Sequence, residues 1–205
     1  PIPDGVLYIT VGADTQDDRF EFEITGWGVG EEHWVLDYQR LYGNLGHTEI
    51  WDRLHEQFSR QFIKANGEVM DIGLVLIDSG GHYTDEVYQF CRRNPRKYIP
   101  IKGATVMGKP IITFPRKKNR QGVYLTEIGT DTAKDVLYAR LADVPPSLSG
   151  SLPGYRHHPV AEWADEPYFK GLTCERKRVE FIKGRRVYRW VNPSGARNEP
   201  TDCAV

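Results

Sequence analysis

The sequence predicts an α/β fold in which a mixed β-sheet carries helices on its faces. In the first forty residues, apolar or alternating segments are separated by short polar turns, a pattern typical of antiparallel strands. Further along, segments with helical spacing alternate with short apolar runs, which is typical of strands joined by helices. The predicted order is β-β-β-α-β-α-β. This order gives a five-stranded sheet, whose strand-helix-strand units should cross over right-handed.

The first three strands follow one another closely. Residues 6–14 (VLYITVGAD) are almost continuously apolar, as expected for a strand buried on both faces. Residues 19–28 alternate, so we expect that strand to be half-buried, with its charged side chains on the open face. The inner face of this second strand carries Phe20, Phe22 and Ile24. In the third strand the apolar residues that share a face are Trp34, Leu36 and Tyr38.

Two helices and two strands come next. An apolar residue recurs every fourth position, at Ile50, Leu54, Phe58 and Phe62, which predicts an amphipathic helix with Thr48 as its cap. The run IGLVLID predicts the fourth strand. Thr84 can cap the following helix, and KYIPIKG predicts the fifth strand.

The second half is less regular. Residues 112–128 predict a hairpin with a basic tip, residues 131–141 a helix and residues 143–155 a loop rich in Pro, Ser and Gly. A second hairpin is expected over residues 174–191, turning near Lys183 and Gly184, and a last helix begins near Pro200. We interpret residues 1–205 as one domain. Because the chain lacks an initiator Met and opens on the linker-like PIPDG, we expect it to be cut from a longer polypeptide.

Composition narrows the class of protein. With 205 residues, of which 40% are hydrophobic and 12% aromatic, the chain is globular. A net charge of -1 excludes a polycation, so contacts with nucleic acid must come from local basic clusters. Three cysteines without CxxC spacing argue against a disulfide framework or zinc site and favour a reducing cytoplasm over secretion. No apolar run approaches the ~20 residues of a membrane span.

Three aspartates are the strongest functional candidates. Asp14 and Asp78 each end an apolar strand, and Asp202 lies where the last helix begins. Mg²⁺ and similar hard cations take oxygen ligands, and two such ions can clamp the attacking and leaving oxygens of a phosphodiester. Taken singly, each acid could equally be a strand-end or helix-cap residue.

The order of elements, with acids on the first strand, the fourth strand and a late helix, resembles the ribonuclease H-like nuclease fold. Several long blocks go further and are similar to the C-terminal endonuclease domain of the large terminase subunit of lambda-like tailed phages. These blocks cover nearly the whole chain: GADTQDDRFEFEITGWGVGEEHWVLDYQ, IDSGG, PIKGATVMGKP, PRKKNRQGVYLTEIGTDTAKD and RNEPTDCAV.

The resemblance implies a metal-dependent endonuclease that cuts concatemeric double-stranded phage DNA at cohesive-end sites. It maps the catalytic and metal-binding acids onto Asp14, Asp78 and Asp202. We expect these acids to hold two Mg²⁺ or Mn²⁺ ions, with Asp14 between them because it ends the central strand. It also implies an upstream packaging ATPase, a small terminase subunit and the portal of the procapsid as partners. The setting would be the host cytoplasm.

Basic residues at the two hairpin tips are the candidate DNA contacts. They are Arg116, Lys117, Lys118 and Arg120 in the first hairpin, and Lys177, Arg178, Lys183, Arg185 and Arg186 in the second. These side chains would bind backbone phosphates without recognising the base sequence, and the affinity for DNA would fall as the salt concentration rises. A solvated charged loop is the alternative.

Weaker candidates remain open. Asp17, Asp18 and Glu199 could reach a metal, and Lys102 and Lys109 could approach the scissile phosphate. GATVMGKP matches a phosphate-binding loop only in part, because Pro110 stands where such a loop needs Ser or Thr and a strand follows it. Two other readings stay possible: another ribonuclease H-like nuclease, of the resolvase or transposase type, and a DNA-docking module without catalysis.

Overall fold

The computed structural model describes residues 1–142, 153–182 and 184–205. Most of the loop expected over 143–155, and Lys183 at the second hairpin turn, lie outside the described residues. The described strands are β1 (Tyr8–Thr15), β2 (Arg19–Trp27), β3 (His33–Tyr42), β4 (Gln61–Ile63), β5 (Val69–Asp71), β6 (Leu74–Asp78), β7 (Tyr98–Gly103), β8 (Ile112–Thr113), β9 (Thr126–Ile128), β10 (Arg156–His157), β11 (Arg176–Ile182) and β12 (Arg185–Val191).

The described helices are α1 (Thr48–Phe58), α2 (Thr84–Arg93), α3 (Thr130–Leu141), α4 (Glu166–Leu172) and α5 (Glu199–Ala204), with one 3-10 turn at Val29–Glu31. The last helix thus begins one residue before Pro200, as predicted. None of the helices in the described ranges is both long and apolar enough to cross a membrane.

The central sheet is mixed, as the sequence predicts. Its strand order in the described chain is β10-β3-β2-β1-β6-β7-β9-β8. The five expected strands form its middle, and three short strands extend its edges. β1 pairs antiparallel with β2 and parallel with β6, and β6 pairs parallel with β7. The first predicted hairpin forms only at its root, where β8 pairs with β9, and residues 114–125 make a loop.

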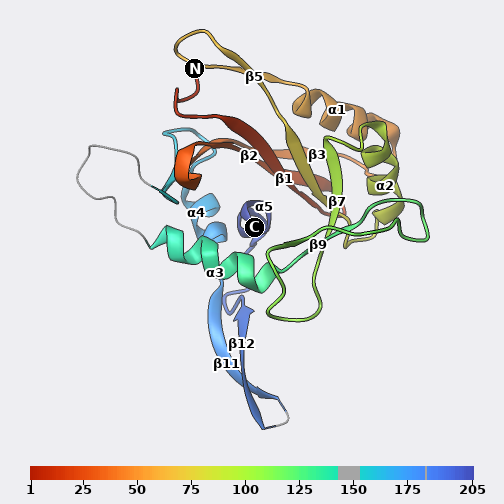
Figure 1. Cartoon of the computed structure of the whole chain (residues 1–205), viewed down its shortest axis with the longest axis vertical. Coiled ribbons are helices and arrows are strands. Elements are labelled where there is room, and N and C mark those ends of the chain that lie inside the picture. Colours follow the sequence, from red (N-terminus) through yellow and green to blue (C-terminus); the bar gives the residue numbers. More distant parts are fainter. Residues whose placement is uncertain (143–152, 183) are drawn as a thin grey trace.

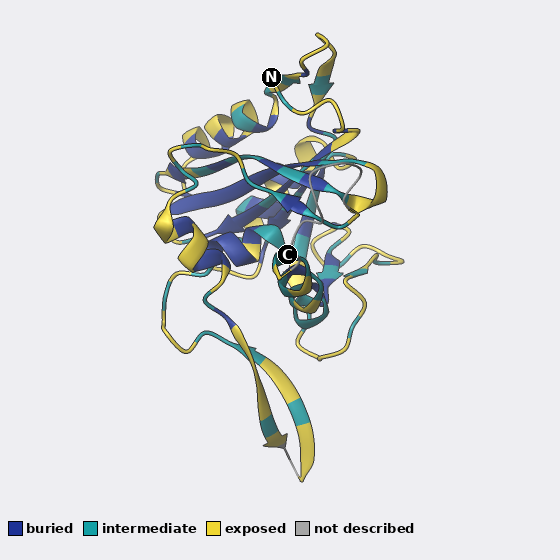
Figure 2. Cartoon of the chain, turned by 90° about the vertical axis from the view of Figure 1, so that its left-hand side faces the viewer, coloured by how far each residue is buried: buried dark blue, intermediate teal, exposed yellow. Residues whose placement is uncertain are grey.

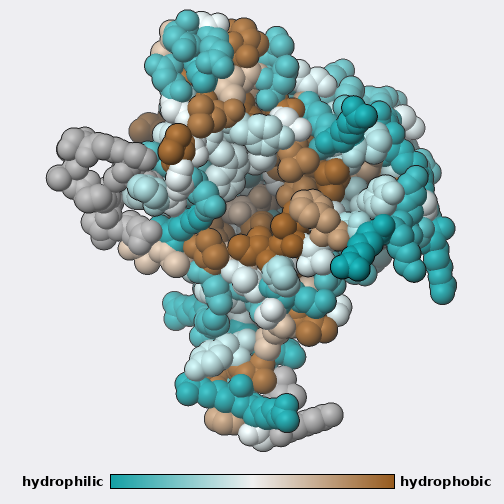
Figure 3. All heavy atoms as spheres, in the orientation of Figure 1, coloured by the Kyte–Doolittle hydropathy of each residue, from teal (hydrophilic) through white to brown (hydrophobic). Residues whose placement is uncertain are grey.

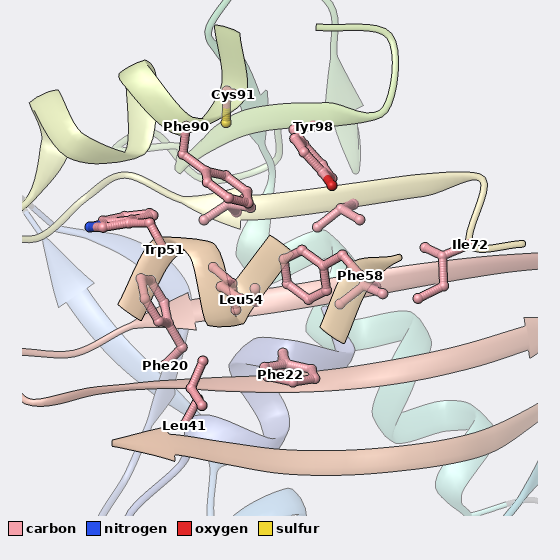
Figure 4. Packing of buried hydrophobic residues seen from close by; sticks show 14 of the residues in the cluster. Phe20, Phe22, Leu41, Trp51, Leu54, Phe58, Ile72, Phe90, Cys91 and Tyr98 are labelled. Atoms are coloured by element: carbon pink, nitrogen blue, oxygen red, sulfur yellow. The ribbon is translucent and has the colours of Figure 1, made fainter. Parts of the chain in front are cut away.

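One face of the sheet packs against α1 and α2. Aromatic side chains fill this layer, and Phe22 and Phe58 meet edge to face with ring centroids 5.2 Å apart (Figure 4). The helix predicted through Phe62 ends at Phe58, because the chain there turns into β4 and pairs with β5. The regular spacing of apolar residues therefore continued into a strand.

The other face of the sheet is covered by α4 and α5, with α3 beside them (Figure 1). This cover corrects the prediction that the second strand is half-buried: Glu21 and Glu23 are each 1% exposed and Arg19 is 5% exposed. The buried charges are paired, Arg19 with Glu21 at 2.6 Å and Arg156 with Glu23 at 2.6 Å. Alternation had correctly assigned the side chains to two faces, but the charged face is inside.

The second predicted hairpin is confirmed as β11 and β12, which pair along their whole length. Gly184 has a left-handed φ of +76°, as a tight turn requires. This β11–β12 hairpin projects from the body of the molecule, and most of its residues are exposed (Figure 2).

Candidate active site

Two of the three candidate aspartates meet because their strands are parallel neighbours. β1 and β6 run side by side with Ala13 opposite Ile77, so Asp14 and Asp78 follow at the same edge of the sheet. The hydroxyl of Thr15 donates to the carbonyl oxygen of Asp78 at 2.9 Å and ties the two strand ends together. Both side chains lie on the face opposite α1 and α2, because residues alternate along a strand.

The third aspartate arrives on α5, which lies directly on β1. A β-carbon on Gly12 would be 2.0 Å from the carbonyl oxygen of Cys203, so only a glycine allows the helix to approach this closely. Asp14, Asp78 and Asp202 consequently line one pocket of about 380 Å³. In Figure 3 the surface is hollowed beside the position of α5, and hydrophobic residues lie at the rim.

Burial dominates the electrostatics of this pocket. It raises the pKa of Asp14 to about 7, against a hydrogen bond from Gln16 that lowers it. Repulsion from Asp202 and Asp78 raises the Asp14 pKa further. Burial likewise raises the pKa of Asp78, although backbone N–H groups, including that of Gly80 at 3.1 Å, favour its charged form.

Burial also raises the pKa of Asp202, and here a lysine opposes it. The Nζ atom of Lys134 lies 3.3 Å from Asp202 Oδ1 and 2.7 Å from Glu175 Oε1, and its charge lowers the Asp202 pKa. Asn198 donates from Nδ2 to both acids, at 2.8 Å and 2.9 Å respectively. No sequence pattern marks Lys134, Glu175 and Asn198 as neighbours of Asp202, because the three residues lie on separate segments.

The weaker candidates take other positions. Asp17 pairs with His82 at 2.8 Å in a solvent-exposed contact, and Asp18 pairs with Arg19 at 2.7 Å. Glu199 is buried and accepts from Arg19 at 2.7 Å, while its Oε2 atom has no hydrogen-bond partner in the described chain.

The two lysines near the fifth strand also differ. The charge of Lys102 partly opposes the rise that burial causes in the Asp78 pKa. Lys109 pairs instead with Glu127 at 3.3 Å. β8 follows the GATVMGKP segment and no helix starts there, as the sequence predicts. The phosphate-binding helix terminus that a nucleotide loop needs is therefore missing from residues 104–113.

The basic candidates lie away from the pocket. The first group is in the loop between β8 and β9, where Lys118 lies 5.7 Å from the ring centre of Tyr124. The second group belongs to the β11–β12 hairpin. The described lining of the pocket includes none of Arg116, Lys117, Lys118, Arg120, Arg185 and Arg186.

The pocket has the chemistry of a hard-cation site. In the part of the chain that the structure describes, no group of three or more His, Cys, Asp or Glu side chains is placed so that it could hold a metal ion. The donors nevertheless fit, since Mg²⁺ uses one or two carboxylates and keeps several waters. Burial is the largest cause of the raised pKa values of Asp14, Asp78 and Asp202, so a bound cation would stabilise the charged forms of these carboxylates.

The mixed sheet has the ribonuclease H-like fold that the sequence predicts, with acids at the ends of β1 and β6 and on a late helix. All 205 residues match the family model described as "Terminase large subunit gpA, endonuclease domain", and the chain belongs to this family.

Two curated relatives are similar over the whole chain. The terminase large subunit of Escherichia phage lambda is 39% identical over 207 residues, and that of Enterobacteria phage P21 is 36% identical over 206 residues. Each match covers 100% of this chain but 32% of the relative. It therefore spans about a third of the length of these relatives.

Solved structures share the fold. The nuclease domain of the large terminase subunit of bacterial virus Sf6 has a TM-score of 0.53 at 13% identity, covering 98% of this chain and 87% of that one. A mutant of the same domain with manganese gives a TM-score of 0.54 at 13% identity, and a mutant with calcium gives 0.52 at 14%, with the same coverage.

Proposed function

We propose that this domain is a divalent-metal-dependent endonuclease that cuts concatemeric phage DNA at cohesive-end sites during genome packaging. The observation that carries the proposal is the meeting of Asp14, Asp78 and Asp202 in one pocket of a terminase nuclease fold. The similar Sf6 domains were solved with manganese and with calcium, which supports a divalent cation as the cofactor.

In this proposal the three aspartates are the catalytic residues and hold two Mg²⁺ or Mn²⁺ ions. Such ions lower the pKa of a bound water and stabilise the leaving oxygen of a phosphodiester. The chain's own groups prepare the site: Thr15 fixes the strand ends, and Lys134 with Asn198 orients Asp202. The apolar part of the pocket wall would limit the access of bulk water, which strengthens electrostatic interactions inside.

The proposed partners follow from the same family. Double-stranded DNA is the substrate, and basic residues of the loop between β8 and β9 and of the β11–β12 hairpin contact its backbone. The packaging ATPase upstream in the same polypeptide, the small terminase subunit and the portal of the procapsid complete the machinery in the host cytoplasm. Membership of the terminase family argues against a resolvase or transposase.

Supercoiled plasmid tests the activity. The wild-type domain in Mg²⁺ or Mn²⁺ should nick and linearise the plasmid, and EDTA should prevent it. Asp14→Asn should lower the rate by at least about a hundredfold, because it removes one of the charges that hold the cation. Cleavage by Asp14→Asn at the wild-type rate would contradict the assignment. A folded wild-type domain that never cuts would favour the docking module. A cooperative thermal unfolding transition is the control that Asp14→Asn is folded.

A further inference from the structure

We propose that the two faces of the β11–β12 hairpin have different roles, and that the DNA backbone lies on the face formed by Arg176, Arg178, Arg185 and Arg189. This inference rests on the proposed function only in taking DNA as the ligand. It assigns which side of the hairpin the DNA contacts, a distinction that a list of basic residues does not make.

The strand register separates the basic side chains into two sets. Arg178 is paired with Arg189, whereas the adjacent pairs are Lys177 with Trp190 and Val179 with Tyr188. Paired residues of an antiparallel hairpin lie on the same face, and each next pair lies on the opposite face. Four arginines therefore share one face, which we call the arginine face.

The opposite face is aromatic, and we call it the aromatic face. It carries Lys177, Val179, Phe181, Arg186, Tyr188 and Trp190. Side-chain contacts agree with this register, because Lys177 and Arg186 both lie over the ring of Tyr188, at 5.6 Å and 5.1 Å from its centre.

At its root the aromatic face packs on α3. The rings of Trp190 and Tyr138 are 4.4 Å apart, Trp190 Nε1 donates to Asp135 at 2.9 Å, and Lys177 pairs with the same carboxylate at 2.7 Å. The arginine face therefore points away from α3. It is open along the hairpin, since all four arginines are exposed.

The arginine face carries excess positive charge. Glu180, 3.3 Å from Arg189, makes the one ion pair to these four arginines in the part of the chain that the structure describes. Arg178 and Arg189 stand directly opposite each other, an arrangement of like charges that destabilises a hairpin. A polyanion that binds across both strands would relieve this repulsion.

The shape of the hairpin suits duplex DNA. A two-stranded β-ribbon fits the major groove, and guanidinium groups bind phosphate oxygens in a bidentate manner. By contrast, the cations of the aromatic face are engaged: Lys177 by Asp135, and Arg186 by the ring of Tyr188. Among the basic residues grouped from sequence, Arg178 and Arg185 are thus assigned to DNA, and Lys177 and Arg186 are not.

The root of the hairpin connects this face to the proposed active site. Glu175 immediately precedes β11 and accepts from Lys134 at 2.7 Å, and Lys134 also contacts Asp202 at 3.3 Å. β12 leads through residues 192–198 into α5, which carries Asp202. The hairpin that holds the DNA is therefore joined at its root to the short segments that position Asp202.

Two double variants with equal charge loss test the proposal. Arg178→Gln with Arg185→Gln removes two charges from the arginine face, and Lys177→Gln with Arg186→Gln removes two from the adjacent positions on the aromatic face. Binding of a fluorescent duplex is measured by anisotropy in EDTA, which prevents metal-dependent cutting, from about 50 to 200 mM salt. Circular dichroism checks that each variant is folded.

The arginine-face variant should bind at least about tenfold more weakly at about 100 mM salt, and the slope of log K against log salt should become shallower by about 2. The aromatic-face variant should keep the wild-type slope. Arg178→Lys with Arg185→Lys should restore most of the slope, because it restores the charges.

Equal weakening by both variants, stronger weakening by the aromatic-face variant, or no DNA binding by the wild type would each overturn the assignment. Plasmid cutting by the wild type is scored separately. If the domain cuts DNA but both double variants bind alike, the proposed function stands and this inference fails. If the domain does not cut but only the arginine-face variant binds weakly, this inference stands and the proposed function fails.

Discussion

The carboxyl group of Asp14 shows what the environment does to a single residue. Asp14 is 8% exposed and has Asp78 and Asp202 as charged neighbours, so burial and repulsion both favour its protonated form. Nothing in the strand VLYITVGAD distinguishes this aspartate chemically from an ordinary strand-end acid. Its altered proton affinity arises from β6 and α5, which the fold places beside it.

This raised pKa predicts a pH dependence of stability without metal. The folded-state pKa of Asp14 is about 7 and the ordinary value is 3.8, so the folded protein binds this proton more tightly. The stabilisation is therefore complete below about pH 4 and is lost as pH rises to about 7. In EDTA, Asp14→Asn should become more stable than wild type by a few kcal/mol as pH rises through this window.

Urea unfolding of both proteins at several pH values measures the difference. Mg²⁺ should stabilise the wild type above pH 7 and have a smaller effect on Asp14→Asn, because a cation replaces the missing proton. A stability difference that does not change with pH would show that the Asp14 carboxyl titrates normally.

At the scale of elements, close backbone contacts decide where the helices lie. Gly12 lets α5 lie on β1, and a β-carbon on Gly171 of α4 would be 2.8 Å from the ring of Pro200 in α5. Both glycines are in ordinary regular structure, where Gly is otherwise unfavourable. Their presence is explained by the packing of α5 and hence by the placement of Asp202.

Gly12→Ala should therefore displace α5. The added β-carbon would clash with a backbone oxygen that cannot rotate away, so we expect a loss of about 1–3 kcal/mol in the free energy of unfolding and reduced plasmid cutting. Thermal and urea unfolding measure the effect. Gly81→Ala is the control for stability, because its nearest atom would be at 3.5 Å. Equal stability of Gly12→Ala and wild type would contradict the close approach.

Trp190→Ala should release the β11–β12 hairpin from α3. The substitution removes the ring contact with Tyr138 and the hydrogen bond to Asp135. An isolated two-stranded hairpin is only marginally stable, so its amide exchange should become faster while that of β1 and β6 is unchanged. Val187→Ala on the arginine face is the matched control. Unchanged exchange in Trp190→Ala would mean that the hairpin is held elsewhere.

Across the whole molecule, buried charges join the sheet to the helical layer on its second face. Arg156 of β10 donates to Glu23 of β2 at 2.6 Å, and Tyr168 of α4 donates to the same carboxylate at 2.7 Å. Glu23 is 1% exposed, so its charge depends on these partners. Three segments far apart in the sequence are thus held by one carboxylate.

Arg156→Met should cost about 3–5 kcal/mol of unfolding free energy, because it leaves the buried Glu23 charge without its cationic partner. Adding Glu23→Gln should recover part of this loss, since the remaining amide carries no charge. Urea unfolding of the wild type, the single variant and the double variant measures both changes. A double variant that is less stable than Arg156→Met would show that the pair itself, and not its isolated half, carries the stability.

Much of the fold was predictable because local patterns report it directly. The five central strands, α1, α2, the β11–β12 hairpin and α5 were all expected from periodicity and turn residues. Phe62 was misplaced because helical spacing continued by chance into β4. The short strands β5 and β10 and the seven-residue α4 have too few residues to show a period.

Sequence patterns alone predicted the order of the central strands and helices, the two faces of β2, and the three acids that line the pocket. The burial of Glu21 and Glu23 and the contact of Lys134 with Asp202 emerge only when the chain is folded. The packing of the hairpin on α3 likewise determines which of its arginines face outward. The physical reason is that periodicity fixes the direction of a side chain, whereas burial and charge partners depend on which distant segments pack over it.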